Sequence, residues 1–173
     1  VNVYGIGMKG NIAAMIGLIH RGRLPRLPRL SNRLSLVAVA DLARALILAA
    51  KSIEANGKTY LVTDGEAYAV SEIEQQIYRC LGRRLPARHT PTMVLYAASL
   101  AAGLLSQLGI RKSGISGRTY RNLTSENLFS NDDICAELGF RPSTTLYDIL
   151  PAISRNIVDV MAAEADKIVE KEK

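Results

Sequence analysis

The amino-acid sequence predicts an α/β fold with few strands and several helices. Three short strand-like segments, VNVY, LSLVAV and TYLVTD, alternate with longer segments whose apolar residues recur at helical spacing. This alternation is typical of a parallel or mixed sheet covered by helices. The chain has 173 residues and 48% of them are apolar, which is enough for one substantial core. We expect a single domain over residues 1–173, with no linker and no internal repeat.

The first forty residues predict a strand, a glycine turn, a helix and a second strand. VNVY is followed by the turn GIGMKG and by NIAAMIGLIHRG, in which Ile12, Met15, Ile16 and Ile19 share one helical face. The next segment, RGRLPRLPRLSNR, should stay extended because each proline restricts its own φ and the residue before it. LSLVAV is almost wholly apolar, which predicts a buried strand.

Boundary signals divide the middle of the chain. Asp41 is expected to cap a helix that ends at Gly57, and TYLVTD is the next strand. Ser71 and Glu74 have the spacing of a capping box, before a helix that stops at Gly82.

The remaining residues are mostly helical by pattern. The apolar part of TMVLYAASLAAGLLSQLG falls short of the roughly 20 residues that span a bilayer, which favours a buried or lid-facing helix over a membrane contact. SGRTYRNLTSENLFS predicts a loop with a short strand, and DDICAELG predicts a short helix ended by glycine. The final helix is expected to bend, or to begin late, at Pro151.

Basic charge is concentrated at the start of the chain. The net charge is +6, and residues 1–40 hold six basic side chains and no acid, whereas the rest is balanced. This asymmetry indicates an anionic partner. One interpretation is a basic anion-binding module for nucleic acid or an anionic membrane surface. Against it, no aromatic residue lies among the arginines of RGRLPRLPRLSNR to stack on bases, and no helix-turn-helix or zinc pattern is present.

Metal binding and nucleophilic catalysis are not predicted. Cys80 and Cys135 have no CxxC partner, and His20 and His89 are far apart, so we assign no metal ligand and no catalytic residue. Two isolated cysteines suit a reducing, cytoplasmic location. Because the chain opens with Val1 inside a strand, we expect it to be part of a longer protein.

Five motifs, in order, resemble those of the extended short-chain dehydrogenases, specifically the NAD-dependent sugar-nucleotide epimerase/dehydratase family. Residues 2–7 resemble its NVYGPG, 32–43 its RDFVHVDDLA segment, 58–65 its vYNvGsG, 130–142 its DxSKARRELGWRP and 145–150 its TLeeGL. UDP-glucose 4-epimerases of bacterial surface-polysaccharide pathways are closest in character. The resemblance implies that the chain is the C-terminal portion of a Rossmann-type enzyme, which binds the nucleotide-diphosphate sugar.

The resemblance also implies what lies outside this chain. A complete member carries a GxxGxxG loop for the dinucleotide pyrophosphate and a Tyr-x-x-x-Lys pair for proton and hydride chemistry, and the sequence contains neither. The glycine turn at residues 5–10 resembles the turn that follows the family's VYG instead. We therefore expect NAD to be bound mainly by an absent N-terminal dinucleotide-binding region. The chain alone is expected to be inactive.

Seven residues are predicted to bind the substrate. The resemblance implies that Arg33 holds the diphosphate, together with either Arg118 or Arg121. It also implies that Asn2 reaches the sugar, that Asn11 binds the nucleotide and that Val70 packs beside the base. Arg26 is added because arginines recur every third residue in the proline-held loop and would share one side of it. A guanidinium can bind two phosphate oxygens at once. The alternatives stay open, since Asn11 equally suits a helix cap and the arginines equally suit solvent.

The expected partner is a UDP-sugar or related nucleotide sugar, rather than nucleic acid or a membrane. In the family, VNVY and TYLVTD pair within the sheet of the cofactor domain. Without that domain these strands leave open edges and an uncovered apolar face. We therefore expect a homo-oligomer, or self-association through the uncovered edges.

Overall fold

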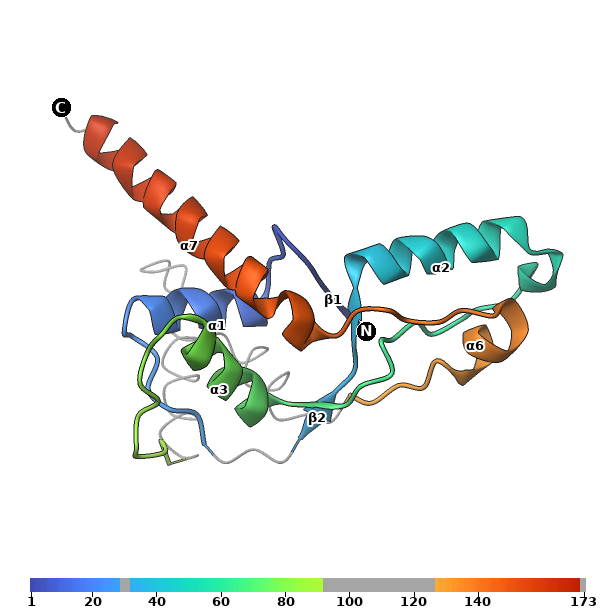
Figure 1. Ribbon diagram of the computed structural model, residues 1–173, viewed down its shortest axis with the longest axis horizontal. Coiled ribbons are helices and arrows are strands. Elements are labelled where there is room, and N and C mark those ends of the chain that lie inside the picture. The colour runs from blue at the N-terminus through green and yellow to red at the C-terminus, as the bar shows by residue number, and fades with distance from the viewer. Residues whose placement is uncertain (29–31, 92–126, 172–173) are drawn as a thin grey trace, which may run out of the picture.

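The computed structural model describes residues 1–28, 32–91 and 127–171 (Figure 1). It is a mixed α/β fold with few strands and several helices, which confirms the predicted class. In chain order the elements are β1 (Asn2–Tyr4), α1 (Asn11–His20), β2 (Arg33–Leu34), β3 (Leu36–Ala38), α2 (Val39–Lys51), the 3₁₀ turn η1 (Ile53–Ala55), β4 (Tyr68–Ala69), α3 (Val70–Cys80), α6 (Asp132–Leu138) and α7 (Leu146–Lys171).

The described strands form two small pairs. β1 lies parallel to β3, with Asn2 opposite Leu36 and Tyr4 opposite Ala38. β2 lies antiparallel to β4. Because α1 lies between the parallel strands in sequence, β1, α1 and β3 form a crossover unit. This unit brings the glycine turn and the N-terminus of α1 together at the end of β1.

The main core lies between three helices on one side of the strands. The buried residues of α1 are the four predicted from its periodicity, Ile12, Met15, Ile16 and Ile19. They belong to one cluster with the buried faces of α3 and α7, which include Ile73, Ile77, Leu150 and Ile153. Figure 1 shows α1, α3 and the first turns of α7 gathered at one end, with α2 and α6 at the other.

A second, smaller core joins α2 to α6. It contains Ala45, Ile134 and Phe140, all of them buried. α6 forms where DDICAELG predicted it, and Gly139 ends it with a φ of 65° in the left-handed region. α7 begins at Leu146 and runs through Pro151, so the proline does not mark its start.

The predicted strand TYLVTD does not form. Residues 59–64 carry no strand assignment, and Asp64 donates its backbone N–H to the carbonyl of Leu36 at 2.8 Å. A strand needs a ladder of bonds with a neighbour, and no strand of the described residues pairs with this segment. The β-propensity of the segment was therefore a poor guide.

Both predicted helix caps are wrong. α2 begins at Val39, ahead of Asp41, whose side chain is 0% exposed and accepts bonds from residues 143–144. α3 begins at Val70 with no side-chain cap, and the buried carboxylate of Glu74 accepts the backbone N–H of Leu27 at 2.8 Å. In both places a buried carboxylate accepts backbone N–H groups of a distant segment, and a buried carboxylate would be costly to leave unpaired.

The contact of Glu74 with Leu27 gives a first test. Glu74 is 2% exposed, and burial raises the pKa of its carboxyl, although the Leu27 N–H, Arg26 and His89 act to lower it. Because the folded state holds this proton more tightly, the group contributes less stability as pH rises from its ordinary pKa through the raised one. Glu74→Gln, which keeps an acceptor without the charge, should therefore change stability at pH 7 by under about 1 kcal/mol. Glu74→Ala should cost about 1–3 kcal/mol, because Leu27 loses its partner.

Denaturant unfolding at pH 5 and pH 7 measures both variants. Glu72→Gln is the matched control, since Glu72 is exposed on the same helix. Equal losses in the Gln and Ala variants would contradict the assigned role of the acceptor.

Several predictions fall outside the described residues. These are the apolar helix at 92–109 and the arginines Arg29, Arg118 and Arg121. Within the part of the chain that the structure describes, no helix is long and apolar enough to cross a membrane.

Candidate functional site

A cleft of about 330 Å³ lies where β1, the N-terminus of α1, β2, β3 and α3 meet. Three of the predicted substrate-binding residues line it together: Asn2 from β1, Asn11 from α1 and Val70 from α3. Its apolar lining comes from Ile12, Met15, Leu34, Leu36 and Ile73. Residues from three separate segments therefore surround one space, which has both polar and apolar lining.

The N-terminus of α1 opens into this cleft. Gly10 precedes the helix, and no side chain caps it. The first N–H groups of a helix have no partner within the helix and carry partial positive charge, so they suit an anion. Asn11 is the first helical residue and does not act as the cap. Lys9 lines the cleft at the same place and adds a positive charge.

Sequence reasoning missed Lys9 and one property of the glycine turn. Gly5, Gly7 and Gly10 have the spacing G-x-G-x-x-G between a strand and a helix, which resembles a dinucleotide phosphate loop, although the GxxGxxG form is absent. Gly10 has a φ of 104°, and a Cβ there would meet nothing within 4 Å. At Gly5 a Cβ would lie 2.7 Å from Cγ1 of Val39, so the turn packs closely on α2. The turn therefore leaves open space at Gly10, whereas the N–H of Gly7 is already bonded to Oδ1 of Asn156 at 3.2 Å.

The fit to a whole dinucleotide is less complete. In dinucleotide folds an acidic residue beyond the second strand binds the ribose. Asp41 follows β3, but its carboxylate is buried and already bonded to Arg44, Ser143 and Thr144. Asp41 is therefore not available to bind the ribose of NAD.

The structure does not bring the predicted arginines of the loop into the cleft. Leu34 lines the cleft, and because side chains alternate along a strand, Arg33 faces the other side of β2, where it is exposed. Arg26 donates from Nη1 to the carbonyl of Pro86 at 3.1 Å. Its guanidinium lines a separate cavity of about 280 Å³ with Glu74.

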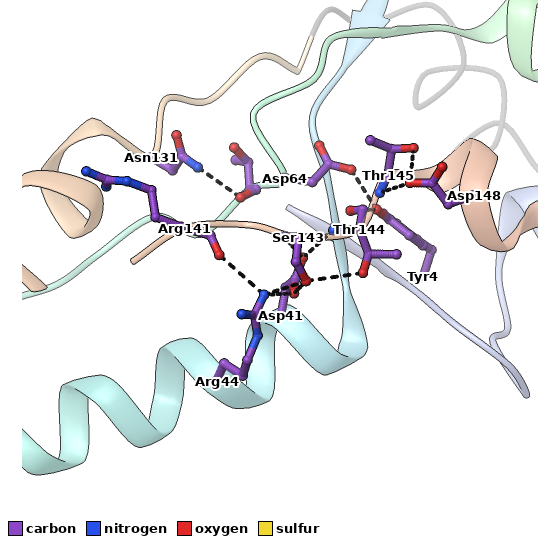
Figure 2. Close-up of polar contacts among 11 residues, drawn as sticks. Tyr4, Asp41, Arg44, Asp64, Asn131, Arg141, Ser143, Thr144, Thr145 and Asp148 are labelled. Carbon is purple, nitrogen blue, oxygen red and sulfur yellow. Dashed lines mark hydrogen bonds and ion pairs between the residues drawn. The ribbon is translucent and has the colours of Figure 1, made fainter. Parts of the chain in front are cut away.

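A network of polar contacts joins β1, α2, the residues around Asp64 and the segment before α7, and Figure 2 shows most of its members. The carboxylate of Asp41 accepts the backbone N–H groups of Ser143 at 3.0 Å and Thr144 at 3.2 Å, and it pairs with Arg44. Burial acts to raise the pKa of Asp41, but these hydrogen bonds to its ionised form outweigh burial and lower it. Asp41 thus joins α2 to the segment before α7.

Asp64 is the centre of the other half of this network. Its Oδ2 accepts the hydroxyls of Tyr4 and Tyr68, each at 2.7 Å, and the Tyr68 oxygen accepts the backbone N–H of Leu146 at 2.9 Å. Burial, together with Asp64, raises the pKa of both tyrosines. Tyr147 packs edge-on against Tyr68 with ring centroids 5.3 Å apart, and burial raises its pKa to about 12. Tyr4 also lines the cleft.

Metal chemistry finds no support in the residues that the structure describes. Within 1–28, 32–91 and 127–171, no group of three His, Cys, Asp or Glu side chains could hold a metal ion. The polar groups at the cleft are amides, one lysine and helix N–H groups, which can bind and orient a ligand.

The fold is shared with solved structures of epimerases. The architecture is that of the C-terminal part of Rossmann-like epimerases, and the chain spans less than half the length of those proteins. An epimerase from Methanothermobacter thermautotrophicus superposes with a TM-score of 0.65 at 17% identity, over 94% of this chain and 42% of that one.

Two further similar structures are complexes with a ligand. A UDP-glucose 4-epimerase from Thermotoga maritima, solved with UDP-glucose, has a TM-score of 0.62 at 16% identity, covering 92% of this chain and 44% of its own. A UDP-glucose 4-epimerase from Thermus thermophilus, solved with NAD, has a TM-score of 0.57 at 18% identity, covering 90% and 44%. No family model matches the sequence, and a search of curated proteins finds no relative. The comparisons establish the fold, and the ligand must be argued from the site.

Proposed function

We propose that the chain is the nucleotide-sugar-binding portion of an NAD-dependent sugar-nucleotide epimerase or dehydratase. The observation that carries this proposal is the cleft itself, which gathers Asn2, Asn11 and Val70 from three segments of the sequence. The sequence resemblance had implied a role for each of them before the structure was considered. Their meeting in one cleft, in a fold shared with epimerases, favours a common ligand.

The chemistry of the cleft matches the parts of a nucleotide sugar. A diphosphate would lie at the N-terminus of α1, where N–H groups, the helix dipole and Lys9 all favour negative charge. The base would pack beside Val70, and the sugar would lie toward Asn2. Binding the non-reacting end of the substrate in this way positions the reacting carbon.

The chemical step requires groups outside this chain. NAD, when bound, would take a hydride from the sugar and return it. We assign its site mainly to a separate dinucleotide-binding region, and residues 1–173 to one substrate-binding portion. This division is supported by the neighbours, of which the chain covers 42–46%. The described residues contribute binding and orientation, and none of them is assigned a catalytic role.

Calorimetric titration at two salt concentrations tests the proposal. The chain is titrated with UDP, UDP-glucose, NAD and a short oligonucleotide. Saturable binding of UDP and UDP-glucose, tighter than that of NAD, is the expected result. Oligonucleotide binding alone, lost steeply with salt, would instead favour the basic anion-binding module.

Replacing Lys9 distinguishes the cleft from the arginine loop. Lys9→Ala should weaken UDP binding by about tenfold, the equivalent of one charge-assisted hydrogen bond. Arg33→Ala should change the affinity by less than about threefold, because Arg33 faces away from the cleft. Lys51→Ala, at the far end of α2, is the control for net charge. A larger loss from Arg33→Ala would show that the resemblance-based assignment of the phosphate ligand is right and that of Lys9 wrong.

A further inference from the structure

Asp64 contacts three segments that line the cleft, although it does not line the cleft itself. Its backbone N–H donates to the carbonyl of Leu36, on β3, at 2.8 Å. Its carboxylate accepts the hydroxyl of Tyr4, on β1, and that of Tyr68, on β4, each at 2.7 Å. Leu36 and Tyr4 line the cleft, and Tyr68 lies two residues before Val70, which lines it as well. A single residue therefore links β1, β3 and the start of α3.

The burial of these groups makes the linkage stiff. Asp64 is 7% exposed, and both tyrosines are almost fully buried. The Leu146 N–H donates to the Tyr68 oxygen, and the Tyr68 hydroxyl donates to Asp64. The Tyr4 hydroxyl donates to the same carboxylate oxygen of Asp64. Consecutive hydrogen bonds of this kind strengthen one another in a buried setting.

The local turn fixes the direction of the Asp64 carboxylate. Oδ1 accepts the backbone N–H of Glu66 at 3.0 Å, which leaves Oδ2 for the two tyrosines. Gly65 follows with a φ of 85°, a conformation that favours glycine. The turn at residues 64–66 therefore orients the Asp64 carboxylate toward the hydroxyls of Tyr4 and Tyr68.

We propose that Asp64 is the positioning residue of the cleft, which sets the distance between the β1 wall, with Asn2, and the α3 wall, with Val70. This inference rests on the proposed function only for the identity of the ligand. The geometric part concerns the protein alone: loss of the carboxylate lets β1 and α3 move relative to each other. A nucleotide sugar that must touch both walls would then bind more weakly.

The experiment compares two buried carboxylates of the same network. Asp64→Asn removes the charge that holds the walls, whereas Asp41→Asn removes one that holds only α2 and residues 143–144. Both variants should lose thermal stability. UDP affinity and methyl NMR spectra are measured at a temperature where both are folded. Ile12, Met15 and Ile73 report on the cleft, and Ile134 in the second core is the internal reference.

Asp64→Asn is expected to weaken UDP binding by about tenfold and to shift the cleft methyls, whereas Asp41→Asn should leave the affinity within about twofold. Unchanged cleft methyls in Asp64→Asn, or an equal loss of affinity in Asp41→Asn, would overturn the proposal. If Asp64→Asn does not fold, Tyr68→Phe takes its place, because it removes the hydrogen bond from Tyr68 to Asp64 and keeps the one from Tyr4. The same loss of UDP affinity and the same shifts of the cleft methyls are then expected. If the wild type does not bind UDP, the proposed function fails, and the methyl spectra still decide the role of Asp64.

Discussion

Replacing Asp41 with alanine is expected to lower the free energy of unfolding by about 3 kcal/mol or more, the largest stability loss of any substitution considered for this chain. The carboxylate is fully buried and accepts bonds from the backbone of Ser143 and Thr144. Without it, the backbone N–H groups of Ser143 and Thr144 lose their acceptor and Arg44 loses its counter-charge. The segment that leads into α7 would then be held only by its remaining contacts.

The same contacts predict an acid dependence. The pKa of Asp41 is lowered in the folded state, so its contribution to stability is complete above its ordinary pKa of about 4 and is lost as pH falls through the lowered value. Wild-type stability should therefore drop below about pH 4. The Asp41→Ala variant should lose less over the same range. Urea unfolding from pH 3 to pH 7 measures both. An equally steep acid loss in the variant would contradict this role.

The second large effect concerns the oligomeric state. The chain alone is expected to self-associate, because β1 pairs with only one of the described strands, and several apolar residues near β1 and along α2 are exposed. These are Val3 and Ile6 near β1, and Val39, Leu46 and Ile53 along α2 and η1. Leu46 is 63% exposed and Ile53 is 84% exposed. Surfaces of this kind are stable in water only when something covers them, and in the isolated chain a second copy is available.

Light scattering coupled to size exclusion tests this expectation. The wild type should elute as a dimer or larger species, and the double variant Leu46→Glu with Ile53→Glu should shift toward the monomer. Val160→Glu, at an exposed position of α7, is the control, since it places one of the same negative charges on a different element. A monomeric wild type with no exposed-surface dye binding would show that these apolar residues need no cover.

Helix faces were the most predictable part of the fold. The buried face of α1 follows directly from the spacing of its isoleucines and methionine, and α6 from its acidic start and glycine stop. The predicted caps failed because Asp41 and Glu74 have the residue types and spacings of caps, yet each bonds a segment far away in the sequence. Local propensity cannot encode such a distant partner.

The resemblance supplied three residues that line the same cleft, and their binding role stays a prediction. Asn2, Asn11 and Val70 meet in the cleft. Lys9 was missed because a single lysine in a glycine turn has no signal of its own. The proposed role of Asp64 could not be predicted from the sequence, because Tyr4 and Tyr68 lie 60 and 4 positions away from it and only folding brings their hydroxyls to one oxygen.

The central claim is that the cleft at the N-terminus of α1 holds the diphosphate of a nucleotide sugar. Amide NMR spectra of the chain, recorded during titration with UDP-glucose, test it most directly. The largest, saturable shifts are expected on Lys9, Gly10, Asn11 and Ile12, with smaller ones near Val70. Shifts confined to Arg21, Arg23 and Arg26, growing without saturation, would contradict it and assign the anion to the arginine loop instead.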